Sequence, residues 1–304
     1  MYLGVDIGGT DIKYGVLDEN RRLVWHDSQP TLAGRTDRAI VDDIIAACRD
    51  LIGRYPVGSI GLGSPGHVLS SRGVIKKAAN LPFRNTPIAD WVSRATARPV
   101  FVGNDANCAA WGEFCAGGHP AGDNLVLITL GTGVGGGMIF NRRLYLGRDE
   151  GAGEIGHICI DYRGLPCKCG RIGCLEAYAS VSALISQTQT VIRRFPDSLL
   201  ARSALDQAVS GKTAFTAAKA GCPAAARVID QYLRYLATGI NSLIMLLRPD
   251  TIVLAGGITH EGSALLDPLQ GLLTENCDLR LSNLKNDAGI IGAALLGAEA
   301  AADG

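Results

Sequence analysis

The chain has 304 residues, 47% of them hydrophobic and 19% charged, which is enough apolar material for one large domain or two of ordinary size. Lys and Arg together number 29, as do Asp and Glu, so the charge balance indicates neither a nucleic-acid partner nor a membrane surface. The first residues lack the features of a signal peptide, and no apolar run reaches the ~18 residues of a membrane span. We therefore expect a cytoplasmic protein that binds a small neutral or anionic ligand.

The first part of the chain alternates predicted strands and helices. Residues 2–7 and 11–17 are predicted strands around Gly8-Gly9-Thr10, and residues 22–26 add a third. Apolar residues at helical spacing predict a helix over residues 37–53 that packs on this sheet. Three further elements follow: a buried strand at 57–63, a helix capped by Thr86 with Pro87 in its first turn, and a short strand at 99–102.

The second part of the chain repeats this plan. After a predicted helix at 106–116, apolar strands are separated again by glycine turns, which indicates an internal duplication. A duplicated chain with two halves would have its ligand site in a cleft between them. The predicted elements here are strands at 125–130, 134–140, 155–160 and 251–254, helices from 175 onward including a long one at 223–247, and a closing helix at 289–301.

The first turn carries residues suited to phosphate. Glycines at Gly8 and Gly9 let backbone N–H groups approach phosphate oxygens, and the Thr10 hydroxyl adds a donor. Asp6 at the strand end can hold Mg²⁺, mostly through water, and Lys13 can face the phosphates or lie at a solvated edge. A glycine hairpin with an Asp-capped turn is the alternative, and the Walker A spacing is absent.

Two later glycine turns strengthen the phosphate interpretation. Gly131, Thr132 and Gly133 lie between two predicted strands, as the first turn does, although a glycine turn packed on a helix is the alternative. Gly256 and Gly257 follow a predicted strand, where a glycine pair can lie against the adenosine part of a nucleotide. The three turns together indicate a nucleotide as the ligand.

Together these turns resemble the actin-like ATPase fold that hexokinases share. Further motifs resemble the ROK family (repressors, open reading frames and sugar kinases), from residue 4 to about residue 293. They are, in chain order, Gly63-Ser64-Pro65-Gly66, Asn80-Leu81-Pro82, Asn104-Asp105-Ala106-Asn107, Gly151-Ala152-Gly153-Glu154-Ile155-Gly156-His157, and the stretch from Cys167 through Cys169 and Cys174 to Glu176.

The resemblance implies an α/β chain with a two-lobed actin-like ATPase (ribonuclease H-like) fold, duplicated mixed-sheet halves and a cleft between them. We predict a small N-terminal lobe of residues 1–105 plus 290–304 and a large C-terminal lobe of residues 106–289 that carries a zinc-binding loop. A homodimer is also implied, with sugar and ATP as ligands and neither nucleic acid nor membrane as partner.

Asp105 is the predicted general base. It follows a strand and precedes a helix, so its carboxylate can take the proton of a sugar hydroxyl that attacks phosphorus, with Mg²⁺ neutralising charge. Taken alone, an Asn-Asp pair here would be read as a helix N-cap, and the resemblance reverses that reading. The resemblance also implies sugar binding by Gly66, Asn80, Asn104, Asp105, Glu154, His157 and Glu176. One departure, Leu69 after Val68, leaves the detail of the sugar-side loop open.

Four residues predict a structural zinc site. His157, Cys167, Cys169 and Cys174 offer one imidazole and three thiolates, a closed tetrahedral set without an open position for an activated water. Such a site would tether the loop of Glu154 to the helix of Glu176, and the other ring nitrogen of His157 would face the sugar. Buried free thiols are the alternative, and that interpretation is favoured for Cys48, Cys108, Cys115, Cys159, Cys222 and Cys277.

The predicted reaction is phosphorylation of glucose at its 6-hydroxyl. N-acetylmannosamine and N-acetylglucosamine kinases of the same family are the alternative, and a non-catalytic sugar sensor is the more distant one. Repressors of the family carry a helix-turn-helix domain before the first glycine turn, and we expect none here because that turn begins at Asp6.

Overall fold

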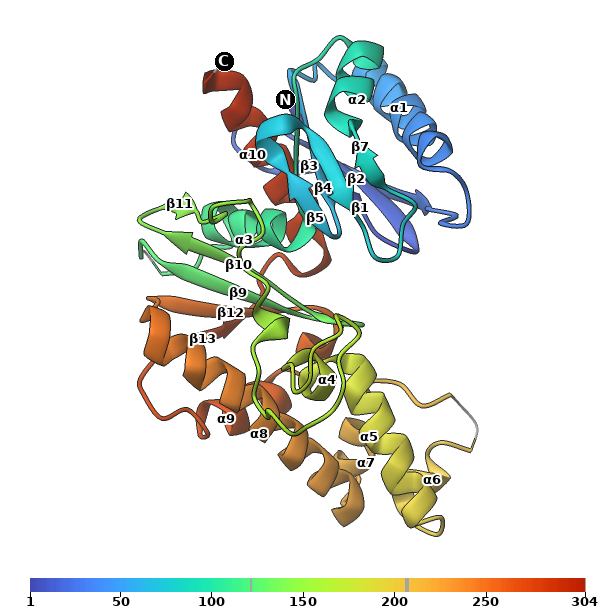
Figure 1. Cartoon of the computed structure of the whole chain (residues 1–304), viewed down its shortest axis with the longest axis vertical. Coiled ribbons are helices and arrows are strands. Elements are labelled where there is room, and N and C mark those ends of the chain that lie inside the picture. Colours follow the sequence, from blue (N-terminus) through green and yellow to red (C-terminus); the bar gives the residue numbers. More distant parts are fainter. Residues whose placement is uncertain (121, 206–207, 304) are drawn as a thin grey trace. The chain divides into compact units, whose positions relative to one another are not determined.

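The computed structural model describes residues 1–120, 122–205 and 208–303. Contacts between Cα atoms divide the chain into two compact units (Figure 1). The predicted lobes were residues 1–105 plus 290–304 and residues 106–289. They differ from these units at α3 (Asp105–Ala116), which was predicted in the second lobe. In the structure α3 packs against α10 (Ala288–Asp303) within the first unit. Unit 1 comprises Met1–Asp123, Gly137–Gly153 and Asn283–Gly304, and unit 2 comprises Asn124–Gly136 and Glu154–Ser282.

Unit 1 is built on a mixed five-stranded sheet. The first two strands form an antiparallel hairpin in which Ile7 pairs with Ile12, and the third continues the antiparallel part. The remaining two strands add in parallel beside the first. In sheet order the strands are β3 (Leu23–Pro30), β2 (Asp11–Leu17), β1 (Tyr2–Ile7), β4 (Ser59–Ser64) and β8 (Val100–Asn104).

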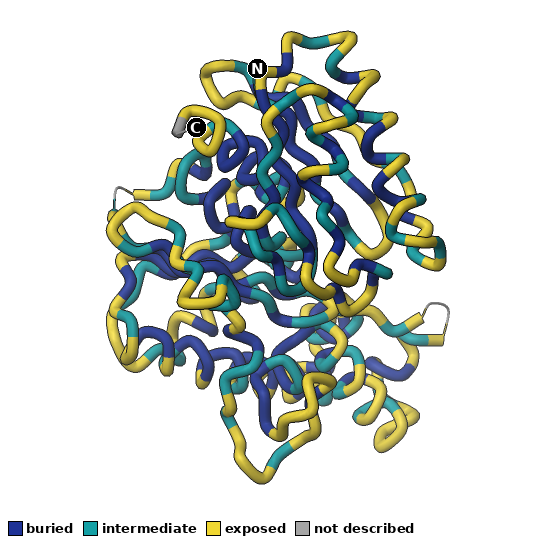
Figure 2. The backbone as a smooth tube through the Cα atoms, turned by 45° about the horizontal axis from the view of Figure 1, so that its top comes forward, coloured by how far each residue is buried: buried dark blue, intermediate teal, exposed yellow. Residues whose placement is uncertain are grey.

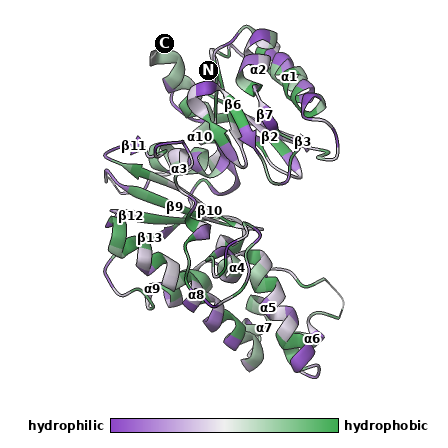
Figure 3. Cartoon of the chain, in the orientation of Figure 1, coloured by the Kyte–Doolittle hydropathy of each residue, from purple (hydrophilic) through white to green (hydrophobic). Residues whose placement is uncertain are grey.

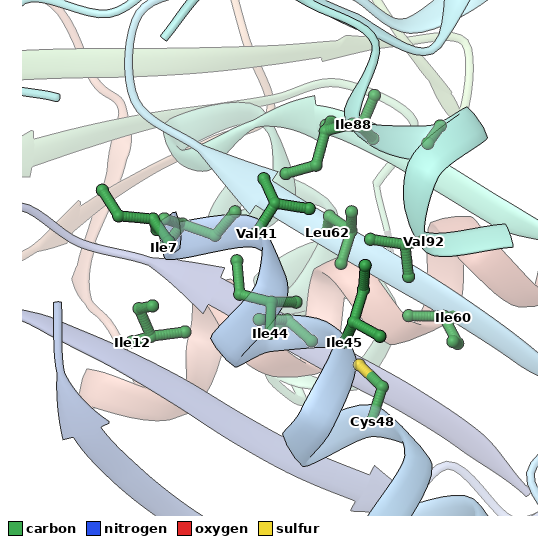
Figure 4. Close-up of a cluster of buried hydrophobic side chains, with 14 of the residues drawn as sticks. Ile7, Ile12, Val41, Ile44, Ile45, Cys48, Ile60, Leu62, Ile88 and Val92 are labelled. Carbon is green, nitrogen blue, oxygen red and sulfur yellow. The ribbon is translucent and has the colours of Figure 1, made fainter. Parts of the chain in front are cut away.

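One face of this sheet is covered by α1 (Asp37–Arg54) and α2 (Ile88–Thr96). Thr36 begins α1 by accepting the Ala39 N–H on its side chain, which satisfies one free donor of the first turn. Successive strand residues point to opposite faces, and the apolar ones point to these helices. Figure 4 shows Ile7, Ile12, Ile60 and Leu62 beside Val41, Ile44, Ile45 and Cys48 of α1 and beside Ile88 and Val92 in the buried cluster.

The opposite face receives α10 at very short range. A Cβ at Gly61 of β4 would lie 1.7 Å from the Ala293 carbonyl oxygen, and a Cβ at Gly292 would lie 1.6 Å from the Cys108 carbonyl oxygen of α3. Glycine is required at both positions because backbone meets backbone there. The closing helix therefore fixes both the sheet and α3.

A small three-stranded sheet also belongs to unit 1 and was not predicted. Its strands are too short to give a sequence pattern: β5 (His67–Leu69), β6 (Val74–Lys77) and β7 (Arg84–Thr86). The predicted capping by Thr86 is wrong, because Thr86 ends β7 and donates its hydroxyl to Asp37 at 2.8 Å. The residue before α2 is Pro87, which makes no side-chain capping bond.

The second five-stranded sheet repeats the order of the first, which confirms the predicted duplication. Strands β9 and β12 are buried along almost their whole length and coloured as hydrophobic in Figure 3, as expected of parallel strands covered on both faces. The order is β11 (Arg143–Leu144), β10 (Val134–Phe140), β9 (Leu125–Leu130), β12 (Thr251–Ala255) and β13 (Asp278–Leu281).

Outside its strands, unit 2 is mostly helical, as predicted. The longest, α8 (Pro223–Leu247), starts with Pro223 in its first turn and packs against its neighbours through an apolar stripe. In Figure 2, where the chain is coloured by the burial of each residue, buried stretches are separated by exposed ones, many of them in the outer loops. The other helices are α4 (Glu176–Ala179), α5 (Val181–Arg194), α6 (Leu199–Arg202), α7 (Thr213–Lys219) and α9 (Ser263–Gln270).

The strand predicted at 155–160 is wrong. Residues Ile155–His157 form one turn of 3₁₀ helix, and the neighbourhood adds an isolated bridge between Cys159 and Cys174. A Cβ at Gly156 would lie 2.1 Å from the Val134 carbonyl oxygen, so the segment packs against the second glycine turn and does not extend a sheet.

Among the described helices, none is both long enough and apolar enough to cross a membrane.

Candidate active site

The first glycine turn is anchored by the segment that follows β3. Gly8 donates its N–H to the Asp11 carbonyl oxygen at 2.9 Å, and the Thr31 hydroxyl donates to the Gly8 carbonyl oxygen at 2.8 Å. The Thr31 N–H donates to the Thr10 carbonyl oxygen at 2.8 Å. These bonds hold the shape of the turn while Gly9 and Thr10 stay exposed. A preformed, exposed turn suits contact with a polyanion.

Asp6 lies at the end of β1 opposite Lys13 of β2. Burial, and after it the charge of Asp105, raise the pKa of the Asp6 carboxyl to about 6, while Lys13 opposes the shift. Lys13 Nζ also donates to the Asn286 carbonyl oxygen at 3.4 Å. A carboxyl with a perturbed pKa at a strand end is typical of a functional site.

The turn from β8 into α3 carries Asn104 and Asp105. Asn104 is the cap: its Oδ1 accepts the Ala106 and Asn107 N–H groups at 3.0 and 3.1 Å. Asp105 occupies the first turn of α3, where its Oδ1 accepts the Ala106 N–H at 2.8 Å and the helix dipole favours its negative charge. The N-cap of α3 is therefore Asn104, and Asp105 is the first residue of the helix.

Several predicted residues of unit 1 come together around these turns. Asn104 Nδ2 donates to the Gly66 carbonyl oxygen at 3.1 Å, and Gly66 has a φ of +92°, which favours glycine. The Asn80 Cβ lies 3.8 Å from where a Cβ of Gly9 would stand. Burial raises the pKa of the Cys108 thiol, and the charges of Asp6 and Asp105 raise it further. Both carboxyls thus act on one buried thiol.

In unit 2 the second glycine turn is tied to Glu176. The Val134 N–H donates to Glu176 Oε2 at 3.0 Å, and a Cβ at Gly133 would lie 2.3 Å from the same oxygen. Gly131 donates its N–H to the Gly133 carbonyl oxygen at 3.0 Å. Thr132 and Glu176 also line a cavity of about 330 Å³ together with Lys168. The turn and the predicted zinc loop therefore share one cavity.

The four predicted zinc ligands converge. Their ligand atoms all lie within 4.8 Å of one another. Cys167 Sγ lies 3.7 Å from His157 Nδ1, and Cys169 Sγ lies 3.7 Å from Cys174 Sγ. Metal–ligand bonds of about 2.0–2.3 Å at tetrahedral angles separate neighbouring ligand atoms by about these distances. The donor set and its spacing fit zinc.

The second ring nitrogen of His157 faces a carboxylate. His157 Nε2 lies 3.8 Å from Glu154 Oε2, and the Glu154 side chain is 64% exposed. With Nδ1 directed at the thiols, Nε2 stays available to a ligand that reaches Glu154. Of the other six cysteines, Cys48, Cys108 and Cys222 are buried as predicted and Cys115 and Cys277 are partly buried, but Cys159 is exposed, so that prediction is wrong for Cys159.

The third glycine turn borders a second cavity of unit 2. Gly256 has a φ of +99°, and a Cβ there would lie 2.2 Å from the Leu130 carbonyl oxygen, so only glycine fits. Gly257 lines a cavity of about 300 Å³ together with Gly131, Thr132 and Glu261. Glu261 was not predicted, because a single glutamate four residues after a glycine carries no sequence signal.

The two sheets with the same strand order and a glycine turn after each first strand define an actin-like α/β fold of the sugar-kinase type. A ROK family model matches residues 2–300, and the chain belongs to the ROK family. It is 36% identical over 310 residues to a glucokinase of Streptomyces coelicolor, with 98% of this chain and 97% of the relative covered. A glucokinase of Halalkalibacterium halodurans is 37% identical over 306 residues, with 96% and 93% covered.

Solved structures agree with this assignment. The chain matches a ROK family glucokinase from Streptomyces griseus, in complex with glucose and AMPPNP, with a TM-score of 0.85 and 35% identity over 98% of this chain and 99% of that one. The predicted fold class is therefore confirmed. Other relatives have different functions, including an N-acetylmannosamine kinase of Yersinia pestis at 30% identity, with 96% of this chain and 97% of that one covered.

Proposed function

We propose that this chain phosphorylates glucose at its 6-hydroxyl with ATP, using Asp105 as the general base. The comparisons assign the chain to the ATP-dependent sugar kinases. Full-length similarity to glucokinases at 36–37% identity carries the choice of glucose. An N-acetylmannosamine substrate is the second candidate, favoured by relatives that act on that sugar.

Asp105 is suited to its role by position. Its carboxylate stands at the start of α3, after a sheet strand, and influences the pKa of Asp6. In the proposed step the glucose O6 bonds to the γ-phosphorus as the bond from the β–γ bridging oxygen to that phosphorus breaks. The hydroxyl proton passes to Asp105, and the electron pair of the broken bond leaves with ADP.

The remaining predicted residues divide the binding work. The glycine turns with Asp6, Thr10, Lys13 and Thr132 are proposed to hold the nucleotide phosphates, and Mg²⁺, when bound, would neutralise their charge. Gly66, Asn80, Asn104, Glu154, His157 and Glu176 are proposed to bind the sugar. Asn104 would bind the sugar in addition to its present contacts. Its Oδ1 caps α3, and its Nδ2 donates to the Gly66 carbonyl oxygen.

We also propose a structural zinc held by His157, Cys167, Cys169 and Cys174. The metal would supply no chemistry to the reaction, because four protein ligands complete its coordination. Its proposed effect is to hold Glu176 and Glu154 in place from either end of the loop. A homodimer is proposed from the family resemblance, and sedimentation velocity at micromolar concentration tests it.

The test is a panel of hexoses and N-acetylhexosamines with Mg-ATP, read by ADP release. We expect turnover of glucose, and a fall in kcat of about 100-fold or more in Asp105→Asn, since positioned acid–base groups contribute 10²–10⁴-fold. Strong turnover of N-acetylmannosamine with little for glucose would transfer the proposal to that sugar. No turnover of any sugar by folded, zinc-loaded protein would leave a sugar sensor in its place.

Asp37→Asn is the matched control. Asp37 also occupies the first helical turn of its helix in unit 1, and its Oδ1 accepts the N–H of the next residue at 2.7 Å, as Asp105 does at 2.8 Å. Both substitutions therefore weaken a helix start to a similar degree. If Asp37→Asn lost as much turnover as Asp105→Asn, the effect would be structural and Asp105 would not be the base.

A further inference from the structure

The cavity beside the third glycine turn lies wholly within unit 2. Its volume is about 300 Å³, at the lower end of the ~300–1,000 Å³ range of small-molecule sites. Gly131 and Thr132 of the second glycine turn line one part of it, and Gly257 and Ile258 line another. A single ligand that fills the cavity would touch two of the three turns at once.

The walls of the cavity suit a flat apolar group. Val181, at the start of α5, and Ile258 contribute apolar side chains. A Cβ at Gly211 would lie 2.8 Å from Val181 Cγ1, so the backbone of that segment lies directly against this wall. A Cβ at Gly257 would meet no atom within 4 Å, which leaves room on that side. A nucleoside base needs such a slot.

Glu261 is an unusual lining residue for such a slot. Its side chain is only 9% exposed, and a carboxylate removed from water to this extent needs hydrogen-bond donors. Lys219 Nζ donates to Glu261 Oε2 at 2.8 Å from the end of α7, with the lysine itself 58% exposed. Within the described residues, Lys219 is the side chain that pairs with Glu261, and it contacts one of the two carboxylate oxygens, Oε2.

We propose that the second oxygen of Glu261 accepts a hydrogen bond from the nucleoside of bound ATP, so that this residue selects the nucleotide. The inference rests on the proposed function, because it assumes that the phosphates lie on the glycine turns. Two groups of ATP offer the required donor: a ribose hydroxyl and the adenine amino group. A buried acceptor rejects an analogue that lacks its donor, because the carboxylate is then left unsatisfied.

The test measures binding and needs no turnover. ADP is titrated calorimetrically into zinc-loaded native protein, Glu261→Met and Lys219→Met at pH 8. Both variants break the same ion pair with the same new side chain, and only the first removes the acceptor. We expect Glu261→Met to weaken ADP by about tenfold or more, as for loss of a hydrogen bond to a charged group, and Lys219→Met to stay within about threefold of native.

Analogues identify the donor. Native protein should bind one of 2′-deoxy-ADP, 3′-deoxy-ADP and IDP about tenfold or more weakly than ADP, while Glu261→Met should bind that analogue and ADP alike. Equal binding of all four nucleotides by native protein would overturn the inference. Equal losses in Glu261→Met and Lys219→Met would also overturn it, since the ion pair would then act only structurally. ADP binding that is unchanged in Glu261→Met refutes this inference alone, whereas native protein that binds no nucleotide refutes the proposed function itself.

Discussion

Replacing Asp6 with Asn should stabilise the protein while it abolishes the proposed activity. The Asp6 carboxyl has its pKa raised from 3.8 to about 6, chiefly by burial and then by the charge of Asp105. Between these two pH values the native state keeps a proton that the unfolded state has lost. The free energy of unfolding therefore falls as pH rises through this window, and the loss is complete above pH 6.

The size of the effect follows from the pKa shift. Each pKa unit corresponds to about 1.4 kcal/mol, so a shift of about two units sets an upper limit of about 3 kcal/mol. Because the side chain keeps some exposure to solvent, we expect roughly 1–2 kcal/mol. An amide at this position does not ionise, so Asp6→Asn should gain this amount at pH 8 and about half of it at pH 5.

Urea unfolding at pH 5 and pH 8, without Mg²⁺ or nucleotide, measures the difference between Asp6→Asn and the native chain. Asp90→Asn is the control, since Asp90 lies on the surface of α2 in an ion pair with Arg94 at 2.7 Å. Its effect on stability should be small and similar at both pH values. If Asp6→Asn lost stability at pH 8, or if its gain did not grow with pH, the electrostatic argument for Asp6 would be refuted.

Four further substitutions test other parts of the molecule. Cys169→Ser or zinc chelation should lower the melting temperature and sugar affinity together, with metal analysis of native protein giving about one zinc per chain. Gly133→Ala would bring its Cβ within 2.3 Å of Glu176 Oε2, so we expect the KM for ATP to rise about tenfold, measured by steady-state kinetics, with stability lowered by only ~1 kcal/mol. Gly292→Ala would set a Cβ 1.6 Å from a backbone carbonyl oxygen of α3 and should cost about 3 kcal/mol or more in urea unfolding. Gly53→Ala, whose Cβ would meet nothing within 4 Å in α1, should instead gain up to ~1 kcal/mol in the same assay.

The sequence was sufficient for the long elements and the duplication, because these depend on local periodicity. Helix α8 was predicted from its helical pattern with the bounds that the structure has, Pro223–Leu247. Strands β5, β6 and β7 were missed because runs of three or four residues cannot establish an alternation. Residues 155–160 are apolar enough for a strand, but the close approach of Gly156 to Val134 is a tertiary contact without a local signal.

The site was predicted from motifs, and local sequence leaves open the role of a residue that could serve in two ways. Asp105 was predicted as the general base, with a helix N-cap as the alternative for the Asn104-Asp105 pair. The structure gives the capping bonds to Asn104 because its Oδ1 reaches two N–H groups of the first turn. The role of Asp105 stays a prediction that kinetics must decide. Glu261 could not be predicted from the sequence at all, because its burial and its ion pair with Lys219 exist only in the folded chain.

The duplication also explains why the two glycine turns need not act alike. Strands β1 and β9 are each third in the order of their sheets, and the residue before the last is Asp6 in one and Thr129 in the other. The Thr129 hydroxyl accepts the Gly135 N–H at 3.1 Å and so braces its own turn without adding charge. A carboxylate at that position would face the same desolvation that raises the pKa of Asp6, and it would repel a bound polyanion. The first turn therefore has a carboxyl at the end of its own strand, whereas the second has a hydroxyl there and receives its carboxylate, Glu176, from a separate helix.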